Sequence, residues 1–233
     1  MNGFSAWLEQ LQYERLLDLV VTVAAALLCI TIHETCHGWA AYRLGDPTAK
    51  QAGRLTLNPL RHIDLLGLVC MAVAHFGWAK PVPINPGNFR HFRRDTAITA
   101  LAGPLSNLVL AVVAFTLYCA GVWLNWYLGQ PEWLYYILLF LNYTGGMSAA
   151  LAVFNLFPIP PLDGSKVLYS LLPERQYQWL LRYERFGFLV LAVLLITGVL
   201  DGPMRFLLDK LLTVLLQICR WPMALLNALV YGR

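Results

Sequence analysis

The chain has 233 residues, of which 58% are hydrophobic and only 13% are charged, and its mean hydropathy is +0.57. An ordinary soluble domain carries about 25% charged residues and needs them to cover its surface. This composition therefore excludes a disordered chain and argues against a soluble enzyme. The net charge of +4 comes without a basic run interleaved with aromatic residues, so we expect no nucleic-acid partner.

Long apolar runs that do not alternate in polarity predict an all-α polytopic membrane protein embedded in the lipid bilayer, because helices satisfy their own backbone hydrogen bonds in lipid. We expect a single integral membrane domain, residues 1–233. Glu9, Glu14 and Asp18 give the N-terminus the wrong charge for a cleavable signal peptide. The first apolar run should therefore stay in the mature protein.

Turn residues and prolines divide the chain into segments. Gly45-Asp46-Pro47 ends the first span, and the prolines of residues 80–87 prevent a helix there. The run 65–79 is short for a span, so we expect it to dip in and return or to lie within the protein. The expected segments are a first core span at 16–44, a membrane-associated irregular or re-entrant region at 48–95, a second core span at 96–124 interrupted by Gly103-Pro104, a third core span at 132–157, a further span at 186–200 and an interfacial or spanning tail at 204–233. Within the irregular region, we expect turns and short strands in residues 48–62.

Basic residues indicate the orientation of these spans. Residues 43–62, 80–95 and 157–185 hold most of the Lys and Arg, whereas residues 122–132 hold none. Basic loops face the cytoplasm. We therefore expect a multi-pass protein of a bacterial or archaeal cell membrane with these three segments on the cytoplasmic side.

His33-Glu34-Thr35-Cys36-His37, at the end of the first span, is the central motif. Four residues turn a helix by about 400°, so both imidazoles face the same way and can share a tetrahedral zinc ion. Glu34 is then placed to take a proton from a metal-bound water. His33 lies about 21 Å along the helix from Leu19, within the hydrocarbon, where ionisable residues mark functional sites. The alternative is a polar cluster that faces lipid headgroups.

A catalytic zinc ion needs a third protein ligand. Asp163 follows a stretch, residues 155–162, whose three prolines prevent a helix, and such backbone is tolerated at membrane depth only inside protein or beside a water-filled cavity. Asp163 would then lie level with His33 and His37, although it could also simply cap the next helix. Other candidates have simpler explanations as packing, loop or helix-start residues: Cys36, His62, His75, His91, Asp64 and Asp95.

Taken together, three motifs resemble the site-2 protease family of intramembrane zinc metalloproteases. They are His33-Glu34-x-x-His37, Gly103-Pro104-Leu105-Ser106-Asn107 and Asn155-x-x-Pro158-x-Pro160-x-x-Asp163-Gly164. The resemblance extends to residues 58–64 and 77–83, and so covers roughly residues 20–170.

This resemblance implies that His33, His37 and Asp163 bind one zinc ion per chain, that Glu34 is the general base, and that Asn155 polarises the scissile carbonyl or holds the oxyanion. It also implies a three-helix catalytic core, followed here by one or more C-terminal helices. The substrates would be transmembrane proteins, cut within the bilayer near its cytoplasmic side. We expect a minimal form without PDZ or CBS domains, because the second and third core spans are separated by too few residues for a domain.

The His33-Glu34-x-x-His37 motif is also compatible with two other functions. A non-catalytic zinc-binding sensor or scaffold would keep the ligands without needing Glu34, and the presence of Glu34 favours an enzyme. Membrane zinc peptidases of another kind take their third ligand from a Glu on a later helix. Glu132, Glu174 and Glu184 lie at segment ends and do not match that pattern.

Overall fold

The structure is a computed structural model that describes residues 3–64, 80–173, 175–177, 180 and 184–231. Its α-helices are α1 (Gly3–Arg43), α2 (Thr48–Gln51), α4 (Phe92–Tyr127), α5 (Glu132–Asn155), α6 (Asp163–Leu171), α8 (Gly187–Ile196), α9 (Asp201–Cys219) and α10 (Trp221–Tyr231). Three short 3₁₀ turns, η1 (Pro59–Arg61), η2 (Pro86–Asn88) and η3 (Glu184–Phe186), interrupt the connections. The prediction of an all-α fold is confirmed.

Four helical stretches are long and apolar enough to cross a membrane: Arg15–Arg43, Phe92–Tyr127, Glu132–Asn155 and Asp201–Val230. The first three overlie the expected core spans. The fourth is the tail, which the sequence left open between spanning and interfacial. Helix α8, in the stretch expected to be a further span, has ten residues and is about 15 Å long, half of the hydrocarbon thickness.

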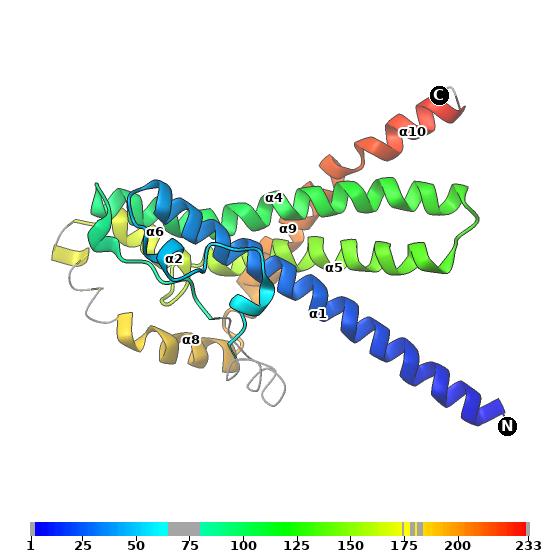
Figure 1. The fold of residues 1–233 in the computed structure, drawn as a ribbon, viewed down its shortest axis with the longest axis horizontal. Helices are drawn as coiled ribbons and strands as arrows, with labels where there is room; N and C mark the ends of the chain where they lie inside the picture. The colour runs from blue at the N-terminus through cyan, green and yellow to red at the C-terminus, as the bar shows by residue number, and fades with distance from the viewer. Residues whose placement is uncertain (1–2, 65–79, 174, 178–179, 181–183, 232–233) are drawn as a thin grey trace.

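Helices α4 and α5 lie antiparallel and side by side, and α1 crosses them so that its second half packs on both (Figure 1). Residues 128–131 join α4 to α5 at one end of this layer. The short helices α2 and α6 lie toward the other end (Figure 1). Helix α9 packs against α4 and α5, and Cys29 on α1 contacts Thr144 and Ser148 on α5.

Two expectations for the interior of the chain differ from the structure. Helix α4 continues through Pro104, although the sequence suggested an interruption there. Neighbouring helices make a proline tolerable inside such a span. The described part of residues 48–95 contains α2, η1, η2 and the first residues of α4 but no strand, and residues 80–85 have no regular secondary structure. Residues 65–79, which we expect to dip in and return or to lie within the protein, are outside the described residues.

Asp46, just after α1, is fully buried and holds segment 80–88 against the end of that helix. Its carboxylate accepts hydrogen bonds from the backbone N–H of Asn85 (2.7 Å), the side-chain amide of Asn88 (2.7 Å) and both the N–H and the hydroxyl of Thr48. Burial raises the pKa of the Asp46 carboxyl, but these hydrogen bonds outweigh burial and hold the pKa below its usual range. The ionised carboxylate therefore anchors segment 80–88.

The N-terminal part of the same segment has its own anchors. The backbone N–H of Lys80 donates to the carbonyl of His62 (2.9 Å), and Arg54 donates to the carbonyl of Lys80 (2.6 Å). Val82 N–H donates to the Glu34 carboxylate at 2.9 Å. Segment 80–88 is thereby tied to α1 at Glu34 and to the residues just after α1 at Asp46.

We expect Asp46→Ala to loosen segment 80–88 selectively. The substitution leaves the Asn85 N–H and the Asn88 amide without their acceptor, and a buried group left unpaired costs about 1–3 kcal/mol. Hydrogen exchange, measured by mass spectrometry in detergent, should show protection of residues 82–89 falling by about tenfold or more, while α5 is unchanged. Equal protection in the variant and the wild type would show that Asp46 is not an anchor.

The same difference should depend on pH. A carboxyl whose pKa is lowered on folding stabilises the fold above its unfolded pKa, about 3.9, and loses that contribution as the pH falls through the lower folded value. The gap in protection between the wild type and Asp46→Ala should therefore be constant from about pH 8 to 5 and shrink below about pH 4.

Candidate functional site

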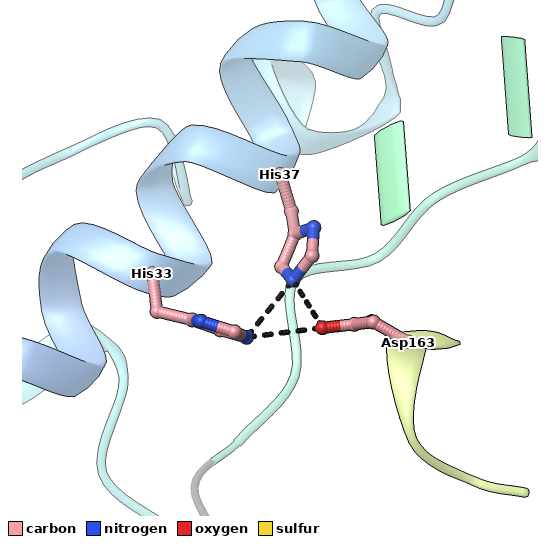
Figure 2. Close-up of side chains that lie close together, drawn as sticks. All are labelled: His33, His37 and Asp163. Atoms are coloured by element: carbon pink, nitrogen blue, oxygen red, sulfur yellow. Dashed lines mark hydrogen bonds and ion pairs between the residues drawn. The ribbon is translucent and has the colours of Figure 1, made fainter. Parts of the chain in front are cut away.

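His33 and His37 lie one turn apart on α1 and point toward Asp163, the first residue of α6 (Figure 2). The two Nε2 atoms are 3.0 Å apart, and Oδ2 of Asp163 lies 3.2 Å from Nε2 of His33 and 3.1 Å from Nε2 of His37. The three residues are only 7%, 6% and 8% exposed. Among the described residues, they form the one group of His, Cys, Asp and Glu side chains whose geometry could hold a metal ion.

The hydrogen bonding of His37 shows which of its atoms faces the cluster as an electron-pair donor. Its Nδ1 lies 2.7 Å from the backbone carbonyl oxygen of Thr99. A carbonyl only accepts, so Nδ1 carries the hydrogen, and Nε2 of the neutral imidazole has a free lone pair. That lone pair faces the carboxylate of Asp163 and the second imidazole. A cation between them stabilises such a convergence of donor atoms.

The spacing of the three atoms fits zinc. Ligand atoms at about 2.0–2.1 Å from a tetrahedral ion lie about 3.3–3.4 Å from one another. The observed separations of 3.0–3.2 Å need only a small expansion to reach that value. Two imidazoles and one carboxylate are also a ligand set that zinc accepts in catalytic sites, where a fourth position stays open.

Asp163 reaches the histidines because the chain turns sharply between α5 and α6. A Cβ atom at Gly164 would lie 2.6 Å from the carbonyl oxygen of Phe157 and would overlap that of Leu156, so only glycine allows this close return. Asp163 must be ionised to act as a metal ligand.

Glu34 and Asn155 line the same cavity of about 280 Å³ as the three clustered residues. Both are half-buried. Glu34 accepts a hydrogen bond from Val82, and Asn155 donates from Nδ2 to the carbonyl of Leu151 in its own helix (3.0 Å). Since an amide carries two hydrogens on Nδ2, one remains for another acceptor. All five site residues expected from the sequence are thus in or beside one cavity.

The other candidate ligands lie elsewhere. Cys36 is half-buried outside the cluster, and His62 is buried with Nε2 against the carbonyl of Thr56. His91 precedes α4, where its N–H donates to Asp95, which also accepts from Arg94. These are structural roles, as the sequence suggested. Asp64 is described but is not part of the cluster, and His75 is outside the described residues.

Sequence reasoning missed one face of α4. Thr99, Gly103 and Asn107, spaced four residues apart, all contact the histidines: Thr99 bonds His37, and Nδ2 of Asn107 lies 3.1 Å from Nδ1 of His33. A Cβ at Gly103 would lie 2.6 Å from Cε1 of both imidazoles. Because four residues are about one turn, this spacing in the sequence was a signal for a shared face.

A helical, membrane-type fold with a buried His-His-Asp donor set beside a carboxylate defines a membrane metalloprotease. The model of Peptidase family M50 matches residues 130–198. "Putative zinc metalloprotease YwhC" of Bacillus subtilis is 36% identical over 185 residues, which cover 77% of this chain and 80% of that protein. "Putative zinc metalloprotease Rip2" is 32% identical in Mycolicibacterium smegmatis (78% of this chain, 69% of that protein) and 30% identical in Mycobacterium tuberculosis strain H37Rv (87% and 78%).

No solved structure matches the chain significantly. The extent of the similarity to these relatives nevertheless assigns the family. The chain belongs to peptidase family M50, the site-2 proteases, and is a zinc metalloprotease.

Gly103→Ala should lower the zinc content of the purified protein, measured by elemental analysis, because the added methyl group occupies space between the imidazoles and α4. Alanine is favoured over glycine inside a helix by about 0.5–1 kcal/mol, so propensity alone predicts no loss. Gly146→Ala, on α5, is the matched control, since its Cβ would meet nothing within 4 Å. Normal zinc content in Gly103→Ala would refute the role of this close contact.

Proposed function

We propose that the protein hydrolyses peptide bonds of transmembrane protein substrates within the bilayer, with one zinc ion per chain held by His33, His37 and Asp163. The observation that carries this proposal is the convergence of three buried donor atoms at 3.0–3.2 Å. Two of them, on His33 and His37, belong to a helix that is otherwise apolar enough to span a membrane. Ionisable groups in such surroundings are costly unless they have a function.

Glu34 is the general base in this proposal. When bound, zinc polarises a carbonyl group and lowers the pKa of a bound water to about 7. The Glu34 carboxylate takes a proton from the attacking water and delivers it to the leaving amine nitrogen. Its place in the cavity beside both histidines supports this role. Before it can act, its hydrogen bond to Val82 N–H must lengthen or be shared.

Asn155 acts on the substrate carbonyl. The Nδ2 hydrogen that is not bonded to Leu151 can donate to the carbonyl oxygen and stabilise the negative charge that develops there. Removing one such donor costs about 10²–10³ in rate in other hydrolases. Asn155 lines the same cavity as the two histidines, which favours this assignment.

Two features support a site that opens toward the cytoplasm. The described parts of the basic segments 43–62, 80–95 and 157–185 lie in connections, short helices and the start of α4 toward the C-terminal end of α1, and basic loops face the cytoplasm. The irregular backbone of residues 80–86 and 156–162 adjoins the cavity and provides a path for water. The same irregular residues 80–85 offer a surface along which an unwound substrate can align, in the manner of an added strand.

Glu34→Gln should abolish cleavage and spare the metal. Loss of the general base removes about 10²–10⁴ in rate, whereas the zinc ligands are unchanged. The assay uses purified protein in proteoliposomes with a panel of single-span model substrates, together with zinc analysis of the same samples. Asp209→Asn, an exposed acid on α9, is the control and should cleave normally. Equal cleavage by wild type and Glu34→Gln would overturn the role of Glu34.

Asp163→Ala tests whether Asp163 is the third zinc ligand. It should lose both zinc and cleavage, because one of three protein ligands is missing. Unchanged zinc content in this variant would remove Asp163 from the centre. Zinc bound by the wild type and lost in Asp163→Ala, together with no cleavage by the wild type, would favour a zinc-binding sensor.

A further inference from the structure

Asn107 lies in the middle of α4 and is fully buried, at 0% exposure. Its side-chain amide contacts Nδ1 of His33 at 3.1 Å, on the side of the imidazole away from the cluster. Oδ1 of the amide has no hydrogen-bond partner. A buried polar side chain at membrane depth with one end unpaired is costly, so its contact to His33 needs a reason.

The reason lies in which nitrogen of His33 carries the hydrogen. If Nδ2 of Asn107 donates, Nδ1 of His33 must accept, and a neutral imidazole then carries its hydrogen on Nε2, the atom that faces Asp163. An imidazole in that form cannot bind a metal through Nε2. Turning the amide by 180° exchanges its oxygen and nitrogen, which are nearly indistinguishable in shape. Oδ1 then accepts from Nδ1–H, and the Nε2 lone pair becomes free.

We propose that Asn107 is a positioning residue that sets His33 as an Nε2 ligand, by accepting a hydrogen bond from Nδ1–H through Oδ1. This inference rests on the proposed zinc centre. The equivalent hydrogen bond is already present at the other histidine, where the Thr99 carbonyl accepts from Nδ1 of His37. Thr99 and Asn107 lie eight residues apart on one face of α4, as His33 and His37 lie four apart on α1.

The two helices run in opposite directions at this contact, so the earlier residue of α4 meets the later histidine. One face of α4 thus holds both imidazoles by their outer nitrogens and leaves both inner nitrogens for the metal. At His37 this contact is made by a backbone carbonyl of α4, whereas at His33 it is made by the side-chain amide of Asn107.

A purely structural role for Asn107, as a polar contact between two helices, makes a different prediction. It would affect stability and leave the metal affinity of a folded variant unchanged. The proposal requires instead that zinc affinity depend on whether residue 107 carries a hydrogen-bond acceptor, independently of any change in the stability of the fold.

The test compares zinc affinities, measured by competition with a chromophoric chelator in detergent. Asn107→Leu keeps the size of the side chain and removes the acceptor, and should weaken zinc binding by about 10–100-fold, as loss of such outer contacts does elsewhere. Asn107→Asp keeps an acceptor and should recover most of the lost affinity. Thr144→Val, another fully buried polar residue, on α5, is the control and should bind zinc normally. Wild-type affinity in Asn107→Leu would overturn the proposal.

A second measurement needs no variant that might misfold. In the zinc-loaded wild-type protein labelled with ¹⁵N-histidine, NMR should show hydrogen on Nδ1 and metal on Nε2 of His33. Metal on Nδ1 would overturn the proposal outright. His33→Ala distinguishes the two levels of inference: if it leaves zinc affinity unchanged, the proposed centre itself fails. If it lowers affinity while Asn107→Leu does not, only the role of Asn107 fails.

Discussion

The close contact between α1 and α4 at Gly103 sets the position of both histidines. Side chains longer than hydrogen at this point would press on the imidazoles, so the two helices could not approach and bond His37 to Thr99. With the helices this close, two histidines four residues apart on α1 lie against a face of α4 whose residues also follow at four-residue intervals. These residues are Thr99, Gly103 and Asn107. The Nδ1 atoms of both imidazoles then contact α4. Their Nε2 atoms converge on the carboxylate of Asp163, at the start of α6.

The irregular backbone around the site follows from the same need for proximity. A helix cannot carry Asp163 back to α1, so the chain breaks at residues 156–162 and turns tightly against Gly164. Segment 80–88 closes the other side of the cavity, tied to Glu34 by Val82 and to the end of α1 by Asp46. Non-helical backbone at this depth is acceptable because it is enclosed by protein and lines a polar cavity rather than lipid.

Much of this could be predicted from sequence, because membrane helices have a strong compositional signal and the His33–His37 spacing is local to one helix. Asp163 could be anticipated only from the proline run before it and from a family resemblance, since no local pattern says where α6 meets α1. Asn107 was missed as a contact because its partner is 74 residues away, although its spacing from Gly103 was visible. The short strands expected in residues 48–62, all of which are described, are absent, and α2 and a 3₁₀ turn capped by the Asn58 side chain take their place.

Zinc X-ray absorption spectroscopy of the purified, zinc-loaded protein is the most direct test of the central claim that His33, His37 and Asp163 hold the metal. The account predicts nitrogen and oxygen ligands only, at about 2.0–2.2 Å, with the multiple scattering of two imidazoles and one zinc ion per chain. A Zn–S distance of about 2.3 Å would bring Cys36 or another thiol into the centre and contradict the account. So would the signature of three or more imidazoles.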